Sequence, residues 1–182
     1  MNSEMAADRI APLYSMLLSV RDRLREGRDR LVLAESCTAG LVAAELGQIP
    51  GISEFFCGSM VVYRTPTKTA WLGISSELLD DPAVGPVSAE VTIALAQAVL
   101  EKTPEATIAA AITGHLGPGA PAEMDGQVHC AMVRRGMPGN RFDVQTLMLI
   151  SPPASDLEDI ARRRIRQKEA ANALLGFLEK KL

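Results

Sequence analysis

Apolar residues recur along this chain at two spacings, one typical of helices and one typical of buried strands. Between residues 10 and 24 they return at steps of three and four, which predicts an amphipathic helix over about 5–26. The continuous apolar run 31–34 is typical of a strand that is buried on both faces. Small and apolar residues over 39–46 then predict a second helix, which ends before Pro50.

The alternation of strand and helix continues to the end of the chain. Strands are expected at 55–63, 107–112, 128–133 and 142–150, and helices at 66–72, from Ser88 onward and at 156–182. The stretch 113–126 holds four glycines and two prolines and is expected to be a loop, while 136–140 predicts a hairpin turn. Together these elements predict an α/β fold, a three-layer α/β/α sandwich with a mixed β-sheet, as a single domain over residues 1–182.

Composition narrows the function classes. The 182 residues are 47% hydrophobic and only 4% aromatic, with a formal net charge of −3. Such a chain lacks the broad positive surface and the stacking platforms by which proteins hold nucleic acid or an anionic bilayer. We therefore expect no nucleic acid and no membrane as partners. The N-terminal segment has no apolar run after a basic start, so no signal peptide is expected.

The thiols and imidazoles do not form a metal-binding pattern. Cys37, Cys57 and Cys130 make no CxxC pair, which is typical of reduced thiols in a cytoplasmic protein. His115 and His129 are separated by a loop and have no third ligand at metal spacing. We expect no metal, no cofactor and a cytoplasmic location.

Small polar side chains gather where the first predicted strand ends. Ser36, Cys37 and Thr38 follow this strand, and Gly40 precedes the next helix. In open α/β sheets ligands bind at the carboxyl ends of strands, and a helix start offers N–H groups to an anion or an oxyanion. The alternative interpretation is that Ser36 or Thr38 only caps the helix, as most such residues do.

A tyrosine and a lysine follow the second predicted strand. Tyr63 ends this strand, and Lys68 lies five residues later in the next helix. A lysine in a dry site beside a serine can lose its proton well below ~10.4 and act as a base, while a tyrosine can relay the proton. Taken singly, the two are more often a strand-end aromatic and a solvated charge. The catalytic interpretation requires that both meet Ser36 in space.

Two further segments could hold the anionic part of a ligand. Thr113 and Gly114 begin the glycine-rich stretch, where backbone N–H groups can approach a phosphate or a carbonyl closely. Arg162 and Arg166 lie four residues apart on the last predicted helix, so one phosphate could accept from both. A structural loop and a solvated helix face are the alternatives.

Taken together, these segments resemble the C-terminal domain of the competence-damage-inducible protein CinA. The resemblance lies in Ala34-Glu35-Ser36-Cys37-Thr38-Ala39-Gly40, Val62-Tyr63 with Lys68, Leu72-Gly73-Ile74, Val87-Ser88-Ala89-Glu90-Val91, Thr113-Gly114 with Gly117-Pro118-Gly119, and Arg162 with Arg166. It covers nearly all of the chain after residue 10. It implies an α/β/α fold without a metal, in the stand-alone form of this domain, with the activity of a nicotinamide-nucleotide amidase (NMN deamidase).

Residue by residue, the resemblance implies a catalytic Ser36 that is assisted by Tyr63 and Lys68. The substrate-binding residues that it implies are Thr38, Gly40, Thr113, Gly114, Arg162 and Arg166. The chain departs from the family pattern at three places, which are Arg64-Thr65-Pro66 in place of the usual Ser-Asn before the lysine, His115-Leu116 in place of Ile-Ala, and Ala161 in place of a common Asp.

The expected function is hydrolysis of the carboxamide of nicotinamide mononucleotide to nicotinic acid mononucleotide and ammonia. Two alternatives stay open: a related amidase with another amide substrate, because the departures reshape the pocket, and an inactive nucleotide-binding module. The expected partner is a small-molecule nucleotide substrate. The apolar face of the first helix, with Met5, Met16 and Leu17, permits a homodimer.

Overall fold

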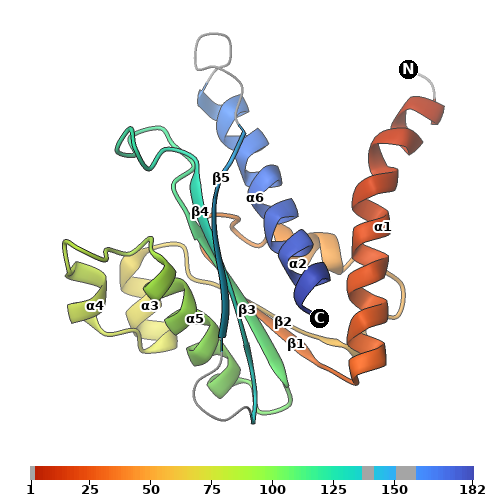
Figure 1. The fold of residues 1–182 in the computed structure, drawn as a ribbon, viewed down its shortest axis with the longest axis horizontal. Helices are drawn as coiled ribbons and strands as arrows, with labels where there is room; N and C mark the ends of the chain where they lie inside the picture. The colour runs from red at the N-terminus through yellow and green to blue at the C-terminus, as the bar shows by residue number, and fades with distance from the viewer. Residues whose placement is uncertain (1–2, 137–141, 151–158) are drawn as a thin grey trace.

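The computed structural model describes residues 3–136, 142–150 and 159–182, in which a five-stranded sheet lies between two layers of helices (Figure 1). The strands are β1 (Leu31–Glu35), β2 (Phe56–Val61), β3 (Ile108–Gly114), β4 (Gln127–Arg134) and β5 (Phe142–Met148). The helices are α1 (Ser3–Gly27), α2 (Leu41–Leu46), α3 (Thr65–Leu72), α4 (Ser76–Asp80), α5 (Ala89–Lys102) and α6 (Asp159–Lys181), with a 3₁₀ turn η1 (Ile52–Glu54).

The sheet is mixed. Its strand order is β2-β1-β3-β4-β5, with β1 parallel to both of its neighbours and β4 antiparallel to both of its own. The ends of β1, β2 and β3, at Glu35, Val61 and Gly114, therefore lie along one edge, which we call the carboxyl edge. This edge collects the turns that carry Ser36, Tyr63 and the glycine-rich loop.

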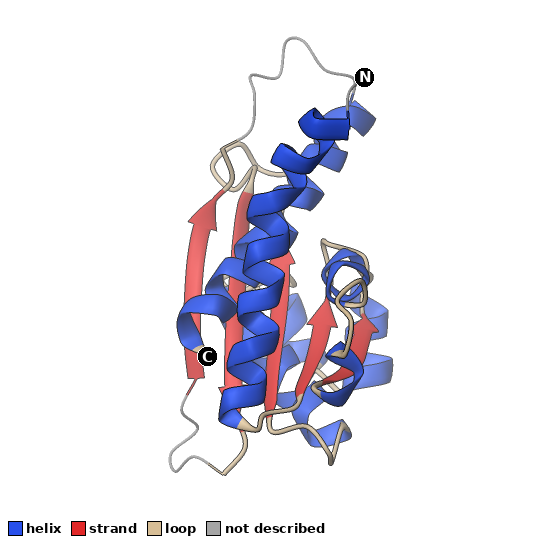
Figure 2. Ribbon diagram, turned by 90° about the vertical axis from the view of Figure 1, so that its right-hand side faces the viewer, coloured by secondary structure: helices blue, strands red, loops and turns tan. Residues whose placement is uncertain are grey.

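Apolar side chains fill the space on both faces of the sheet. One core joins the sheet to α1, α2 and α6, and the other joins it to α3, α4 and α5 (Figures 1 and 2). Alternation along β1 directs Leu31 and Leu33 into the first core and Val32 and Ala34 into the second. A strand buried on both faces is what the continuous apolar run predicts, and the predicted three-layer α/β/α class is confirmed.

Most predicted elements are present with shifted ends. The predicted helix start at Ser88 is confirmed, because its hydroxyl accepts from the N–H of Val91 at 3.1 Å and so caps α5. Strand β3 continues through Gly114, so the first two residues expected in the loop belong to the sheet. The short elements α4 and η1 were not predicted, because one turn shows no periodicity. Parts of the predicted hairpin turn (137–140) and of the last helix (156–158) lie outside the described residues.

Helix α1 uses its apolar face within the chain. Leu17 is buried, and Met16 packs against the core that α1 shares with α6. Leu17 is therefore not available for contact with a second copy of the chain, contrary to the sequence-based expectation. The side chain of Met5 is not among those that the structure describes. The homodimer itself stays a prediction.

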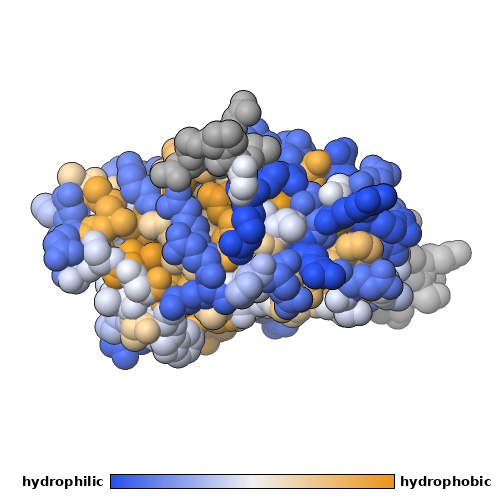
Figure 3. Space-filling model, turned by 90° about the horizontal axis from the view of Figure 1, so that it is seen from below, coloured by the Kyte–Doolittle hydropathy of each residue, from blue (hydrophilic) through white to orange (hydrophobic). Residues whose placement is uncertain are grey.

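No helix in the described part of the chain combines the length and apolarity needed to cross a bilayer. The surface seen from below is mainly hydrophilic, broken by apolar patches (Figure 3).

Candidate active site

The turn after β1 is built around a buried carboxylate, that of Glu35. Its two oxygens accept five hydrogen bonds of 2.8–3.1 Å, from the hydroxyls of Thr38 and Ser59 and from the N–H groups of Gly40, Val42 and Ala43. The first N–H groups of a helix have no partner within it, and a carboxylate at this position satisfies them. Glu35 thus fixes the turn and the start of α2 to the end of β1.

This carboxylate corrects the expectation for the start of α2. The helix start was expected to offer its N–H groups to an anion or an oxyanion of a ligand, but those of Gly40, Val42 and Ala43 donate to the chain's own Glu35 carboxylate. The hydroxyl of Thr38 is used in the same way. The substrate-binding roles of Thr38 and Gly40 stay predictions that these donors do not support. The N–H of Thr38, in contrast, donates no hydrogen bond to any described residue.

Ser36 and Cys37 stand in this turn, against the end of β3. Ser36 is buried, and its N–H donates to the carbonyl of Ile112 at 3.1 Å, while its hydroxyl has no partner among the described residues. A Cβ on Gly114 would lie 3.2 Å from Sγ of Cys37 and 2.5 Å from a side-chain carbon of Val128, so only glycine fits there. Burial raises the pKa of Cys37 to about 12, against smaller effects of Lys68 and Arg163. The thiol therefore stays protonated at neutral pH.

Lys68 is a buried cation at the carboxyl edge. It extends from α3 with 2% of its surface exposed, and its Nζ donates to the carbonyl of Pro86, in the segment before α5. No carboxylate pairs with it within the described ranges. Burial lowers the pKa of Lys68 to about 8, and the nearby Cys37 opposes this change. Roughly a tenth of this amine is therefore uncharged at pH 7 and able to accept a proton, far more than for a lysine with an ordinary pKa.

The predicted trio shares this edge without hydrogen bonds among its members. Ser36 and Lys68 are both buried, and Lys68 lies near enough to Cys37 to affect its pKa. No hydrogen bond joins Ser36, Tyr63 and Lys68 in the described part of the structure. Tyr63 is 49% exposed, so the structure leaves its ring at the surface.

Thr113 belongs to a buried polar link between β3 and α5. Its hydroxyl lies 2.8 Å from that of Thr92, which donates to the carbonyl of Ser88 at 2.6 Å. Because the hydroxyl hydrogen of Thr92 is used for Ser88, Thr113 is the donor to Thr92. The link holds the start of α5 against the sheet, and a role of Thr113 in substrate binding stays a prediction.

The arginines of α6 are arranged differently from the predicted pair. Arg162 donates to Asp159 at 2.9 Å, and Arg166 donates to both oxygens of Asp125 at 2.6 and 2.9 Å. Their predicted role in holding a phosphate stays untested, but both charges already have carboxylate partners. Arg163, which sequence reasoning did not single out, donates to the hydroxyl of Tyr63 at 2.6 Å and to the carbonyl of Gly117.

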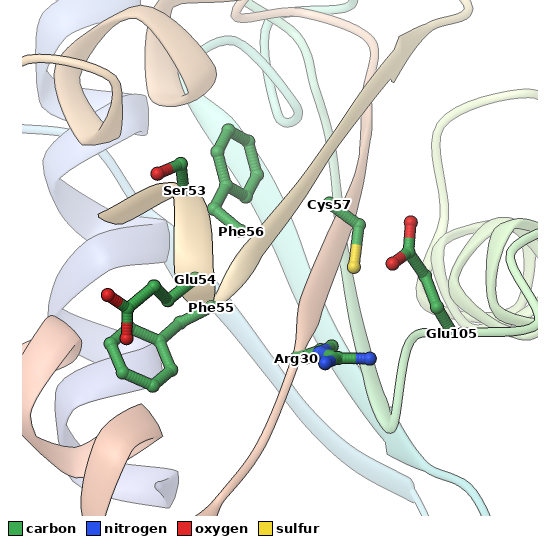
Figure 4. Close-up of a pocket in the computed structure, with 7 residues that line it drawn as sticks. All are labelled: Arg30, Ser53, Glu54, Phe55, Phe56, Cys57 and Glu105. Atoms are coloured by element: carbon green, nitrogen blue, oxygen red, sulfur yellow. The ribbon is translucent and has the colours of Figure 1, made fainter. Parts of the chain in front are cut away.

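Two cavities help to locate the site. One of about 400 Å³ lies between the turn and α6, and it is lined by Thr38, Ala39, Gly40, Leu41, Ala44, Arg164, Gln167 and Lys168. Another of about 350 Å³ is lined by Arg30, Ser53, Glu54, Phe55, Phe56, Cys57 and Glu105 (Figure 4). The residues of this second cavity lie near the starts of β1, β2 and β3, at the edge opposite Ser36. Since open sheets bind ligands at the carboxyl ends of their strands, it is not the candidate active site.

Comparison with known proteins identifies related sequences. The family model of the CinA C-terminal domain matches residues 14–180. CinA-like proteins of Myxococcus xanthus and Chlorobium phaeovibrioides are 38% and 42% identical to this chain, over 65% and 64% of its length. The matched regions are 28% and 27% of those two proteins, so the chain spans less than a third of their length.

Solved structures with similar folds carry related names. The competence damage-inducible protein A (ComA) of Klebsiella pneumoniae has a TM-score of 0.72 at 22% identity, covering 90% of this chain and 95% of its own. The competence/damage inducible protein CihA of Agrobacterium tumefaciens has a TM-score of 0.70 at 26% identity, covering 90% and 94%. At 22% identity, the similarity to ComA shows the fold alone. Both structures agree with a sheet that lies between two layers of helices.

Proposed function

The chain belongs to the family of CinA C-terminal domains, and on that premise we propose that it is a nicotinamide-nucleotide amidase, which hydrolyses nicotinamide mononucleotide to nicotinic acid mononucleotide and ammonia. The observation that carries the proposal is Lys68, a buried lysine beside the serine turn that has no carboxylate partner in the described residues. Burying a charge without a partner is costly, and such groups with strongly shifted pKa values cluster at functional sites.

In the proposed first step, the uncharged amine of Lys68 takes the proton of the Ser36 hydroxyl. Ser36 Oγ then bonds to the carboxamide carbon, whose oxygen becomes a tetrahedral oxyanion. Nζ of Lys68 donates to the carbonyl of Pro86 and has to turn toward Ser36, since catalytic hydrogen bonds often tighten only with substrate present.

The oxyanion needs donors at the same edge. The N–H of Thr38 stands in the serine turn and donates to none of the residues that the structure describes, while Gly114 lies against that turn at the end of β3. We assign the oxyanion to these two N–H groups. Losing one such donor typically lowers turnover by roughly 10²–10³.

In the second half of the reaction, the oxyanion collapses and the C–N bond breaks. The leaving nitrogen takes the proton from the Lys68 ammonium and departs as ammonia, which leaves an acyl ester on Ser36. The same amine then deprotonates water, which attacks the ester and restores the Ser36 hydroxyl. One water is consumed for each ammonia released. The half-exposed Tyr63 assists by contact with substrate at the mouth of the site.

Ammonia release from nicotinamide mononucleotide by the purified chain tests the proposal. We expect ammonia and nicotinic acid mononucleotide in equal amounts, and a loss of at least ~10³ in turnover for Ser36→Ala. Ser53→Ala, an exposed serine at the opposite edge, serves as the matched control and keeps full activity.

Three results would contradict the proposal, each at a different point. Full activity in Ser36→Ala would reject the serine mechanism. Ammonia release from another amide but not from this nucleotide would change the substrate. Nucleotide binding without ammonia release would remove the enzyme activity.

A further inference from the structure

The four arginines at the start of α6 differ in what they bind. Arg162 binds Asp159, Arg166 binds Asp125, and Arg164 lines the cavity beside α2. Arg163 binds two neutral groups, the hydroxyl of Tyr63 at 2.6 Å and the carbonyl of Gly117. One guanidinium thus joins α6 to the segments that follow β2 and β3.

Within the described ranges, the charge of Arg163 has no carboxylate beside it to compensate it. No acidic partner binds it among the residues that the structure describes, whereas its neighbours Arg162 and Arg166 both have one. A guanidinium makes stronger hydrogen bonds to a phosphate or a carboxylate than to a neutral hydroxyl or carbonyl. An anionic group at this position would therefore displace Tyr63 and Gly117 with a gain in binding free energy.

The guanidinium also lies at the mouth of the proposed site. The strands that precede Tyr63 and Gly117 flank β1, which ends at the serine turn. Gln167, one helical turn after Arg163 on α6, donates to the carbonyl of Cys37 at 3.3 Å, which places this face of the helix against the serine turn. A nucleotide with its carboxamide at Ser36 carries its phosphate at the other end, beyond the ribose, and this end points outward.

We propose that Arg163 binds the 5′-phosphate of the substrate and thereby selects a nucleotide over the nucleoside that lacks this phosphate. The inference rests on the proposed amidase function for the position of the carboxamide. When the nucleotide binds, the guanidinium leaves Tyr63 and Gly117 and donates two N–H groups to phosphate oxygens. Arg163 replaces the pair Arg162 and Arg166 as the phosphate ligand.

The test compares nicotinamide mononucleotide with nicotinamide riboside, which has the same carboxamide and no phosphate. We expect Arg163→Gln to raise KM for the nucleotide at least ~10-fold, as for the loss of one charge-assisted hydrogen bond, with little change in kcat. The kinetics of the nucleoside stay unchanged. Lys180→Gln, which removes an exposed cation at the other end of the same helix, changes neither substrate, and a cooperative thermal transition shows that Arg163→Gln is folded.

Two kinetic outcomes would overturn the inference. Equal losses for nucleotide and nucleoside in Arg163→Gln would mean that Arg163 acts through Tyr63 or the fold. A selective loss of the nucleotide in Arg162→Gln or Arg166→Gln, with Arg163→Gln unchanged, would return the role to the predicted pair.

Calorimetric titration separates this inference from the proposed function. The nucleotide and the nucleoside are titrated into Ser36→Ala and into the double variant with Arg163→Gln. If binding is selective for the phosphate, Arg163→Gln removes that selectivity and the wild type shows no turnover, the result would support the phosphate site and contradict the amidase. If the wild type turns over the nucleotide and Arg163→Gln leaves the phosphate selectivity intact, the result would support the amidase and contradict the phosphate site. Absence of nucleotide binding would contradict both.

Discussion

Two buried charges lie at the carboxyl edge of the sheet, and their surroundings differ in one respect. Glu35 accepts five hydrogen bonds from its turn, from α2 and from β2, whereas Lys68 donates one, to the carbonyl of Pro86. A buried charge with a full set of partners holds a structure together, and a buried charge with few partners raises the free energy of the folded state. We therefore assign a structural role to Glu35 and its partners, which form the structural side of the edge, and a catalytic role to Lys68, on its reactive side.

The difference matters for reactivity because an amine with one acceptor gains little from remaining charged. Burial accordingly lowers the pKa of Lys68 to about 8. A neutral amine at this place can remove a proton from a hydroxyl, which a fully paired ammonium cannot do. The same edge can thus be rigid on one side and reactive on the other.

Removing the paired charge should have the largest effect. Glu35→Ala leaves three N–H groups and two hydroxyls without their acceptor and opens a cavity, so we expect the free energy of unfolding to fall by about 3–5 kcal/mol. Denaturant unfolding measures this free energy. Glu54→Ala, an exposed carboxylate at the opposite edge, should change it by less than about 0.5 kcal/mol. A loss below about 1 kcal/mol in Glu35→Ala would show that this carboxylate does not hold the turn.

Removing the poorly paired charge should have the opposite sign. Lys68→Met relieves the cost of burying this charge, about 3 kcal/mol for a pKa lowered to about 8, and loses the hydrogen bond to Pro86, about 1 kcal/mol. We expect a net gain of about 2 kcal/mol in the free energy of unfolding at pH 7, together with loss of turnover. A lower free energy of unfolding in Lys68→Met than in the wild type would mean that Lys68 has a structural role.

The pH dependence of that gain has a defined sign. Between about pH 8 and 10.5 the unfolded lysine binds a proton that the folded one has released, so wild-type stability rises with pH in this window. The advantage of Lys68→Met should therefore be largest below pH 8 and shrink above it.

Turnover should follow the protonation of Lys68. Because the base must be uncharged, kcat/KM is expected to rise about tenfold per pH unit below pH 7 and to level off above about 8. Lys68→Arg should be inactive at every pH, since a guanidinium does not lose its proton in proteins. A wild-type profile that is flat from pH 6 to 9 would exclude Lys68 as the base.

The layers of the fold could be predicted from the sequence because they are encoded in local spacing. The apolar run 31–34 predicted a strand buried on both faces, and a helix was predicted from Ser88 onward, where α5 begins. These predictions depend only on residues a few positions apart in the sequence, and the structure confirms both of them.

The partners of charged residues could not be predicted in the same way, because tertiary geometry sets them. Arg162, Arg163 and Arg166 follow one another within about one helical turn, and the rotation of α6 against the sheet decides which one reaches Tyr63. Lys68 carries no local sign of burial. Its place after the second strand made it a candidate base, and the resemblance to a family implied its catalytic role. Glu35 did carry a sign, since a carboxylate that ends a buried strand requires donors.

The smallest effect tests whether the two sides are separate. Ser59→Ala removes one of the five donors of Glu35 and should cost about 1 kcal/mol with unchanged turnover, since four donors remain. Ser59 and Lys68 share no hydrogen-bond partner in the described residues, so the effects of Ser59→Ala and Lys68→Met on the free energy of unfolding should add within about 0.5 kcal/mol. The double variant measures this sum. A coupling above about 1 kcal/mol would mean that the two charges belong to one network, and the division between a structural and a reactive side would then not hold.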